Sequence, residues 1–270
     1  GDNLLVALAS GAIVEIGDAT TTLVAPTVLI DVVYALIAYN ASDGDFVLAR
    51  AARRGSDAQL AAWHVSGGAA VAVAETSLDA TCAATHAWLA PASTAAFVVG
   101  GGRGLHIAEL RGDRWAVEAA AECKAPALLC TTALGARVAC VDEANEVTLY
   151  RRADASDMFR LERVGTIEAA PSRVVAIQFP EAASSQALCA QTSVPAPWRL
   201  EAVPAHVATS DCNGVVHIYA RGAGEAWTLW RRLEPVCGVV GRAFAGVADL
   251  IADERPRPHR RALARACAVC

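Results

Sequence analysis

The sequence predicts an all-β fold built from a repeated strand–turn–strand unit. The clearest copy spans residues 206–219, where an apolar run ends in Ser210-Asp211, Asn213-Gly214 follows, and a second, alternating run begins. Asn-Gly tolerates positive φ at both positions of a tight turn, so it is the strongest short-range signal of a β-hairpin. Four weaker copies, and a period-two alternation with no competing helical period, extend this prediction along the chain.

The weaker copies repeat the order of apolar run, turn and alternating run at residues 5–16, 36–48, 97–107 and 138–150. The shorter intervals between turns approach the roughly 40 to 50 residues of a propeller blade, and insertions explain the longer ones. The repeat therefore predicts a β-propeller of four-stranded blades. About five blades are recognisable, and divergent or partner-supplied blades would bring the number to six or seven.

The strands are expected in five successive units. The first has three strands (3–9, 12–16 and 21–24), and the second starts at 28–33, passes through the Asp43-Gly44 turn and ends near 60–65. The third runs from 81–88 to 115–118, the fourth from 128–130 to 159–164, and the fifth from 174–179 to 227–233. A sixth unit starts at 237–240. We interpret residues 1–248 as the propeller, with a loop insertion at 180–204, and residues 249–270 as a basic C-terminal extension.

Composition excludes several classes of protein. A chain of 270 residues with 54% apolar residues has enough material for one sizeable all-β domain, and disorder throughout is not expected. The net charge of −5 predicts no nucleic-acid surface, except through the basic extension. No apolar run reaches the length of about 18 to 20 residues that spans a bilayer, so membrane contact is expected to be indirect.

The nine cysteines are scattered over predicted strands and turns without the spacing of a disulfide framework. They are expected to be buried, reduced thiols that behave as small apolar residues. We therefore expect Cys130, Cys140 and Cys189 to stay reduced and to react slowly with thiol reagents until the protein unfolds. Reduced thiols favour a cytoplasmic or nuclear location.

No catalytic, cofactor or metal motif is present, and no small-molecule substrate is expected. The run from Gly100 to Gly104 lies between two strands with no helix after it, so we interpret it as a flexible hairpin turn rather than an anion site. His106 and His217 occupy matching places in their strands and are expected in the core or an interface. Asp43 and Asp211 are expected to stabilise turns by accepting backbone N–H bonds.

Interface candidates come from aromatic and basic side chains, a combination typical of binding hot spots. Trp227 and Trp230 are three residues apart in one strand, so they point to opposite faces. One is expected to pack between blades, and the other, with Arg231 and Arg232, either forms an exposed anchor or is buried as well. Trp198 is a candidate contact within the insertion. The basic extension is expected to be solvated, with an acidic partner or RNA as the alternative.

Residues 173–233 resemble a WD-repeat blade. The resemblance rests on the inner strand Val-Val-Ala-Ile-Gln-Phe-Pro, the hairpin Ala-Thr-Ser-Asp-Cys-Asn-Gly-Val-Val-His-Ile-Tyr and the outer Trp-Thr-Leu. More narrowly, this stretch is similar to the small six-bladed propellers of the COPII vesicle coat and the nuclear-pore Y-shaped scaffold. Gly-His and Trp-Asp dipeptides are absent, so the resemblance does not carry over the hydrogen-bond network of standard WD repeats.

The resemblance implies a non-catalytic scaffold subunit of a nuclear-pore or vesicle-coat assembly, associated with the nuclear envelope or a coat. It also implies an α-helical-repeat partner that completes the ring with an added strand or blade. We expect the open strand edge beside the first unit, near residues 3–16, or beside the unfinished sixth unit. The alternatives are a propeller subunit of another complex, such as a ubiquitin-ligase receptor or an organellar assembly, and a propeller enzyme.

Overall fold

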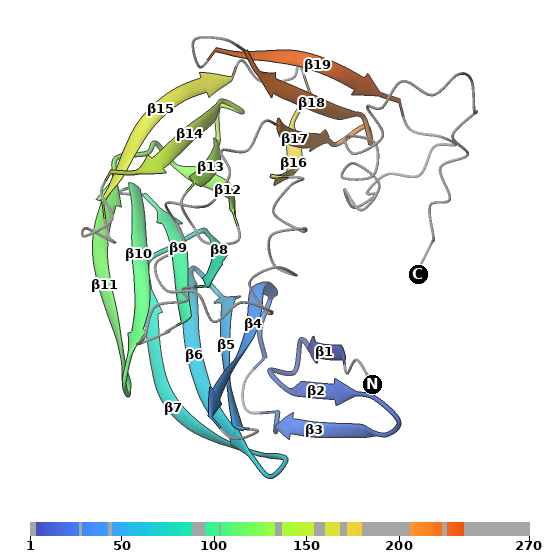
Figure 1. The fold of residues 1–270 in the computed structure, drawn as a ribbon, viewed down its shortest axis with the longest axis vertical. Helices are drawn as coiled ribbons and strands as arrows, with labels where there is room; N and C mark the ends of the chain where they lie inside the picture. The colour runs from blue at the N-terminus through green and yellow to red at the C-terminus, as the bar shows by residue number, and fades with distance from the viewer. Residues whose placement is uncertain are drawn as a thin grey trace.

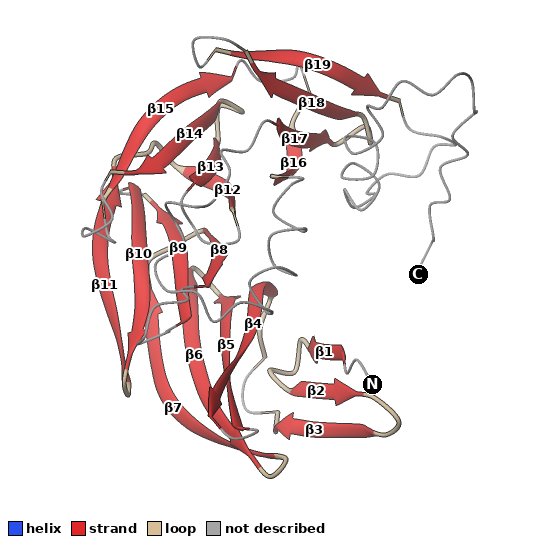
Figure 2. Cartoon of the chain, viewed as in Figure 1, coloured by secondary structure: helices blue, strands red, loops and turns tan. Residues whose placement is uncertain are grey.

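The structure of the chain, a computed structural model, describes residues 4–26, 29–42, 45–87, 95–102, 104–132, 137–153, 160–167, 172–179, 206–222 and 226–234. Every regular element among these residues is a β-strand, as Figure 2 shows. The predicted all-β class is therefore confirmed. The alternating and Ala- or Val-rich segments favour extended backbone because their side chains fit a pleated, half-buried surface.

Nineteen strands within the described ranges form five antiparallel sheets, in each of which the strands pair in chain order. The first sheet has three strands: β1 (Leu4–Ala7), β2 (Ile13–Ile16) and β3 (Thr20–Val24). The second contains β4 (Val32–Ser42), β5 (Asp45–Arg54), β6 (Asp57–Ser66) and β7 (Ala69–Leu78), and the third β8 (Cys82–Ala87), β9 (Ala95–Gly101), β10 (Gly104–Arg111) and β11 (Arg114–Ala121). The fourth contains β12 (Pro126–Thr131), β13 (Arg137–Asp142), β14 (Val147–Arg152) and β15 (Leu161–Ile167), and the fifth β16 (Val174–Gln178), β17 (His206–Asp211), β18 (Val216–Arg221) and β19 (Trp227–Leu233).

The sheets follow one another along an arc in the manner of propeller blades, and the arc is not closed (Figure 1). The first strands of the four-stranded sheets lie on the inside, where β4 contacts β8, β8 contacts β12, and β12 contacts β16. The last strands lie outside, where β3 contacts β7, β7 contacts β11, β11 contacts β15, and β15 contacts β19. The first and fifth sheets stand at the two ends of the arc.

The prediction for the second unit was wrong about its outer strand. Residues 60–65 lie in β6, the third strand, and the outer strand is β7, which the sequence reading left unassigned. Residues 43 and 44 lie outside the described residues, and the flanking Ser42 and Asp45 pair the first two strands of this sheet, whereas the matched turns of the third, fourth and fifth sheets join the second and third strands. The strands β5, β6 and β7 are ten residues long and rich in Ala, a weak strand former, so their boundaries carried little signal.

One turn recurs with the same geometry in three sheets. Its first residue donates its N–H to the carbonyl of the fifth, and its fourth residue donates to the carbonyl of the first, at distances of 2.8 to 3.1 Å. The first residues are Leu8, Asp142 and Asp211, and the fourth residues, all with positive φ, are Gly11, Asn145 and Gly214. Because this turn joins the second and third strands in the fourth and fifth sheets, β1 corresponds to a second strand.

The core is divided among the seams between neighbouring sheets. Leu48 and Ile13 belong to the seam of the first and second sheets, and Phe97 and Leu60 to that of the second and third. Tyr150 and Leu105 fill the next seam, and Val207 and Leu149 the last. The seam between the second and third sheets is lined mostly by alanine, whose small side chain lets the two sheets approach closely.

Candidate interaction surfaces

The inner edge of β1 is unpaired within the described residues. In every four-stranded sheet the second strand lies between two neighbours, and those of the third and fifth sheets, β9 and β17, are buried along almost their whole length. In β1, the matching strand, Leu4 is 61% exposed and the other three residues are only partly buried. Leu8, in the turn that follows, is 41% exposed. The first sheet therefore lacks an inner strand among these residues.

Pairing geometry shows which backbone groups face this open edge. Leu8 donates its N–H to Ala12 at 2.8 Å, and β1 pairs with β2 without a bulge. Backbone groups alternate sides along an antiparallel strand, so Leu4 and Val6 bond to β2, whereas Leu5 and Ala7 present their N–H and C=O groups to the open side. An edge with unpaired groups and exposed apolar side chains is a template for another strand.

A buried arginine holds the first sheet to the second. Arg50 on β5 is 3% exposed, and its Nη1 donates to the carbonyl of Gly11 at 2.7 Å. Its guanidinium lies 5.1 Å from the ring centre of Trp63, a cation–π distance. Burial lowers the pKa of Arg50 below its usual value. Arg50 thus holds the turn at Gly11, beside the open edge, against the second sheet. The sequence did not predict this contact because Arg50 and Gly11 are distant in the chain.

The predicted aromatic and basic residues of β19 face two different surroundings. Trp227 packs with Val164 and Leu149 in the seam between the fourth and fifth sheets. Trp230 packs with Ala208 and Ile218 in the cluster on the fifth sheet, where the imidazole of His206 lies 5.1 Å away, centre to centre. The two rings occupy separate clusters, in agreement with the expected opposite faces.

The two arginines of the predicted anchor are exposed. The guanidinium of Arg231 covers the Trp230 ring at 4.3 Å, and Arg232 pairs with Glu234 at 3.0 Å. The neighbouring Leu229 is 52% exposed. Trp230 is itself partly buried under Arg231, so the anchor is a stacked pair rather than a freely exposed ring. Trp198, the insertion at 180–204, the sixth unit and the basic extension lie outside the described residues, and their predicted roles stay predictions.

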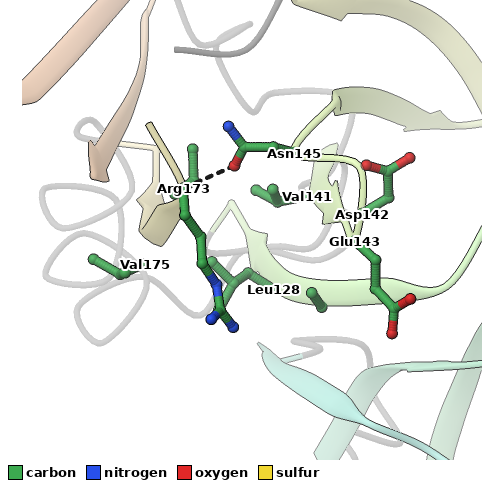
Figure 3. A pocket seen from close by; sticks show the side chains of 9 residues that line it. Leu128, Val141, Asp142, Glu143, Asn145, Arg173 and Val175 are labelled. Carbon is green, nitrogen blue, oxygen red and sulfur yellow. Dashed lines mark hydrogen bonds between the residues drawn. The ribbon is translucent and has the colours of Figure 1, made fainter. Parts of the chain in front are cut away.

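A cavity of about 720 Å³ lies beside the inner strands of the fourth and fifth sheets (Figure 3). Its walls are Leu128, Val141 and the start of β16, with charged groups from Asp142, Glu143 and Arg173. Figure 3 shows that the Arg173 guanidinium and these carboxylates lie apart and do not converge on one point. Among the described residues that line it, the titratable side chains are those of Asp142, Glu143 and Arg173.

Asn145 joins the fourth sheet to the fifth beside this cavity. Its Oδ1 accepts the N–H of Val174 at 2.7 Å, and its Nδ2 donates to the carbonyl of Ser172 at 2.9 Å. The residue also adopts φ of 69°, a left-handed conformation that Asn tolerates well. One side chain therefore closes a turn and fixes the start of the neighbouring inner strand.

Asn145→Gly is expected to lower the free energy of unfolding by about 1 to 2 kcal/mol, because two hydrogen bonds are lost while the backbone stays unstrained. Asn145→Ala should cost roughly 1 kcal/mol more, since Ala fits positive φ poorly. Urea denaturation measures both values. Asn213→Ala, which removes one exposed bond to the Ser172 hydroxyl, is the control and should cost little. Equal losses for Asn145→Gly and Asn213→Ala would contradict the seam role.

The surroundings of the other candidates, His106, His217 and Asp211, indicate structural roles. His106 and His217 both lie on third strands, and burial lowers the pKa of His217. Asp211 is 3% exposed, and its Oδ1 accepts the N–H groups of Asn213 and Val215. The described residues contain no group of three or more His, Cys, Asp or Glu side chains arranged for a metal ion.

The glycine run is packed more tightly than the predicted flexible turn. A Cβ on Gly100 would lie 2.7 Å from the Pro126 side chain, and one on Gly101 would lie 2.4 Å from the carbonyl oxygen of Asp79. Gly101 and Gly104 face each other across the end of the hairpin. Gly100 and Gly101 are therefore required by close approach to neighbouring segments, a tertiary constraint that local sequence does not reveal, whereas a Cβ on Gly102 would meet nothing within 4 Å.

The cysteines within the described residues are free thiols, and two of them are adjacent. Burial raises the pKa values of Cys82 and Cys130 to about 12. In contrast, the Sγ atoms of Cys123 and Cys140 lie 3.1 Å apart. The scattered positions in the sequence gave no sign of this pair. Cys189 lies outside the described residues.

Comparisons with known proteins leave the family open. No protein-family model matches the chain, and no curated protein is significantly similar to it. None of the described residues belongs to a helix that could cross a membrane.

Proposed function

We propose that this protein is a non-catalytic propeller scaffold whose open ring is completed by a protein partner. The observation that carries the proposal is the inner edge of β1, where a strand position that is buried in other sheets leaves Leu4 61% exposed. A ring of sheets is stable when each inner position is filled, so an unfilled position favours addition of a strand. The inner cavity adds support, because its charged side chains do not converge on a reaction centre.

The chemistry of the incoming strand follows from the strands that fill the same place elsewhere. The inner strands β12 and β16 have the sequences Pro-Ala-Leu-Leu-Cys-Thr and Val-Val-Ala-Ile-Gln, and each runs antiparallel to the second strand of its sheet. The partner should therefore supply an extended, mainly apolar segment of about five or six residues, antiparallel to β1. Main-chain hydrogen bonds to Leu5 and Ala7 would hold it.

The resemblance of residues 173–233 to WD-repeat blades of vesicle coats and the nuclear-pore scaffold guides the choice of assembly. A nuclear-pore or coat scaffold, in the cytoplasm or at the nuclear envelope, is the assembly that we propose, with an α-helical-repeat subunit as the partner. In such a scaffold the partner both closes the propeller and links it to the lattice, so no small-molecule substrate or cofactor is needed.

Ala7→Pro is expected to abolish partner binding while the isolated protein stays folded. Proline removes an N–H that faces the open edge and takes part in no bond to β2, so the first sheet keeps its own pairing. Leu4→Lys is a second edge variant, because an edge lysine opposes strand addition. Leu229→Lys is the matched control, since Leu229 is similarly exposed but lies on the outer strand β19. Quantitative affinity capture with mass spectrometry compares the four proteins.

Amide hydrogen exchange tests the same edge directly. In the isolated chain, the Leu5 and Ala7 amides should exchange fast and those of Val6 and Leu8 slowly, and the partner identified by capture should protect Leu5 and Ala7. Slow exchange at Leu5 and Ala7 without a partner would show that the edge is already filled. Partner loss with Leu229→Lys but not with Ala7→Pro would place the interface elsewhere, and turnover of a substrate by the isolated chain would refute the scaffold.

A further inference from the structure

Cys123 and Cys140 meet at the seam between the third and fourth sheets. Cys123 lies in the short link between β11 and β12, and Cys140 lies within β13. Their Sγ atoms are 3.1 Å apart, closer than non-bonded sulfur atoms normally pack. Both side chains belong to the apolar cluster that joins the two sheets.

We propose that Cys123 and Cys140 form a reversible disulfide that locks the third sheet to the fourth. A disulfide needs an S–S bond of about 2.05 Å, so the two sulfur atoms must approach by about 1 Å, which rotation of the partly exposed Cys123 side chain can supply. The pair would thus be a site of oxidative modification. Formation of the disulfide does not require the partner proposed for β1.

The surroundings assign different roles to the two thiols. Cys123 is partly exposed, and a hydrogen bond from the Cys140 thiol stabilises the Cys123 thiolate and lowers the pKa of Cys123 to about 7. Cys140 is 1% exposed, and its hydrogen bond to Cys123 and its burial raise its pKa. Cys123 is thus the thiol that reacts first with an oxidant, and Cys140 lies next to it, in position to form the disulfide.

The reaction balances with a low-molecular-weight disulfide such as glutathione disulfide as oxidant. The Cys123 thiolate attacks one sulfur of glutathione disulfide and releases a glutathione thiolate, which takes up a proton. Cys140 then loses its proton and attacks the Cys123 sulfur of the mixed disulfide, releasing a second glutathione. Two protein thiols are oxidised to one disulfide, and one glutathione disulfide is reduced to two thiols.

The bond would tie two segments that already pack together. The Tyr150 hydroxyl donates to the carbonyl of Glu122 at 3.1 Å, so the link that carries Cys123 is fixed to the fourth sheet before oxidation. The other thiol nearby is protected: Cys82 points at the carbonyl of Pro126, 3.4 Å away, and burial raises its pKa to about 12. Oxidation should therefore select the Cys123–Cys140 pair.

The test equilibrates the 270-residue chain in buffers of reduced and oxidised glutathione, blocks remaining thiols, and maps peptides by mass spectrometry. The folded chain should form the Cys123–Cys140 link at a reduced-to-oxidised ratio at least about tenfold more reducing than the urea-unfolded chain requires, because the native contact preorganises the pair. The oxidised protein should melt roughly 5 °C higher than the reduced one.

Serine variants separate the two roles. Cys140→Ser should accumulate the glutathione mixed disulfide on Cys123, whereas Cys123→Ser should leave Cys140 reduced. Cys212→Ser, which removes an exposed thiol on a distant turn, should leave the link unchanged. The proposal is overturned if Cys123 and Cys140 are alkylated separately at every ratio, if Cys123 pairs with another cysteine, or if folded and unfolded chains oxidise at the same ratio. Peptide mapping of the unmodified sequence gives this answer even if a variant fails to fold.

Discussion

Gly104→Ala is expected to destabilise the protein by about 3 kcal/mol or more, through added methyl volume and backbone strain together. Gly104 has φ of 123°, in a region that only glycine occupies readily. A Cβ there would lie 2.5 Å from the carbonyl oxygen of Ala121 and 3.2 Å from the backbone N of Cys123. Both atoms are main chain, and the pairing of Leu105 with Ala121 prevents them from moving away.

Urea denaturation of the wild type, Gly104→Ala and Gly112→Ala measures this effect. Gly112 also has positive φ, of 63°, but nothing lies within 4 Å of a Cβ placed on it. Gly112→Ala should therefore lower the free energy of unfolding by only about 1 kcal/mol, because it adds backbone strain but no steric clash. Similar losses for the two variants would show that the backbone around Gly104 relaxes, contrary to the tight packing in the structure.

Local sequence was sufficient where a turn determines the pairing of two strands. The hairpin at Asn213-Gly214, the three strands of the first unit and the inner and outer strands of the fifth follow from turn residues and alternation. These features depend on neighbours within a few residues, so the residues themselves carry the signal. The two ends of the repeat array predicted an open edge near residues 3–16 or beside the sixth unit. The unpaired side of β1 agrees with the first alternative, and the sixth unit lies outside the described residues.

Sequence reasoning was insufficient where two sheets meet. The bonds from Arg50 to Gly11 and from Val174 to Asn145, and the contact of Cys123 with Cys140, join residues 39, 29 and 17 positions apart. Such contacts depend on how neighbouring sheets stack, and no local sequence pattern encodes that stacking. The second unit was misread for a related reason: its Ala-rich strands are defined by close packing against the third sheet, which replaces the strong alternation of Val and Ile.

The open edge and the thiol pair lie in different parts of the arc of sheets, so each can be tested without affecting the other. β1 is in the first sheet, whereas Cys123 and Cys140 join the third and fourth. Oxidation should therefore leave capture of the partner at β1 unchanged, and Ala7→Pro should leave the oxidation of the pair unchanged. Distant sites without shared contacts normally behave additively.

Asp211→Ala is expected to lower the free energy of unfolding by about 2 to 3 kcal/mol, because it removes the acceptor of two backbone N–H groups in a buried turn. Asp211 Oδ1 lies 2.9 Å from the Asn213 nitrogen and 3.0 Å from that of Val215. Asp211→Asn keeps a side-chain oxygen and should cost about half as much. Asp142→Ala, which removes one bond in the matching turn, to the Glu146 N–H, is the control and should cost about 1 kcal/mol.

Urea denaturation gives the global cost, and amide exchange at Val215 gives the local one. The Val215 amide donates to Asp211 and lies within a fifth sheet that is otherwise unchanged, so its exchange should accelerate in Asp211→Ala and stay slow in Asp142→Ala. If Asp211→Ala instead keeps full stability and slow Val215 exchange, the buried carboxylate does not hold the turn. A role other than turn stabilisation would then have to explain why an acidic side chain that is 3% exposed lies there.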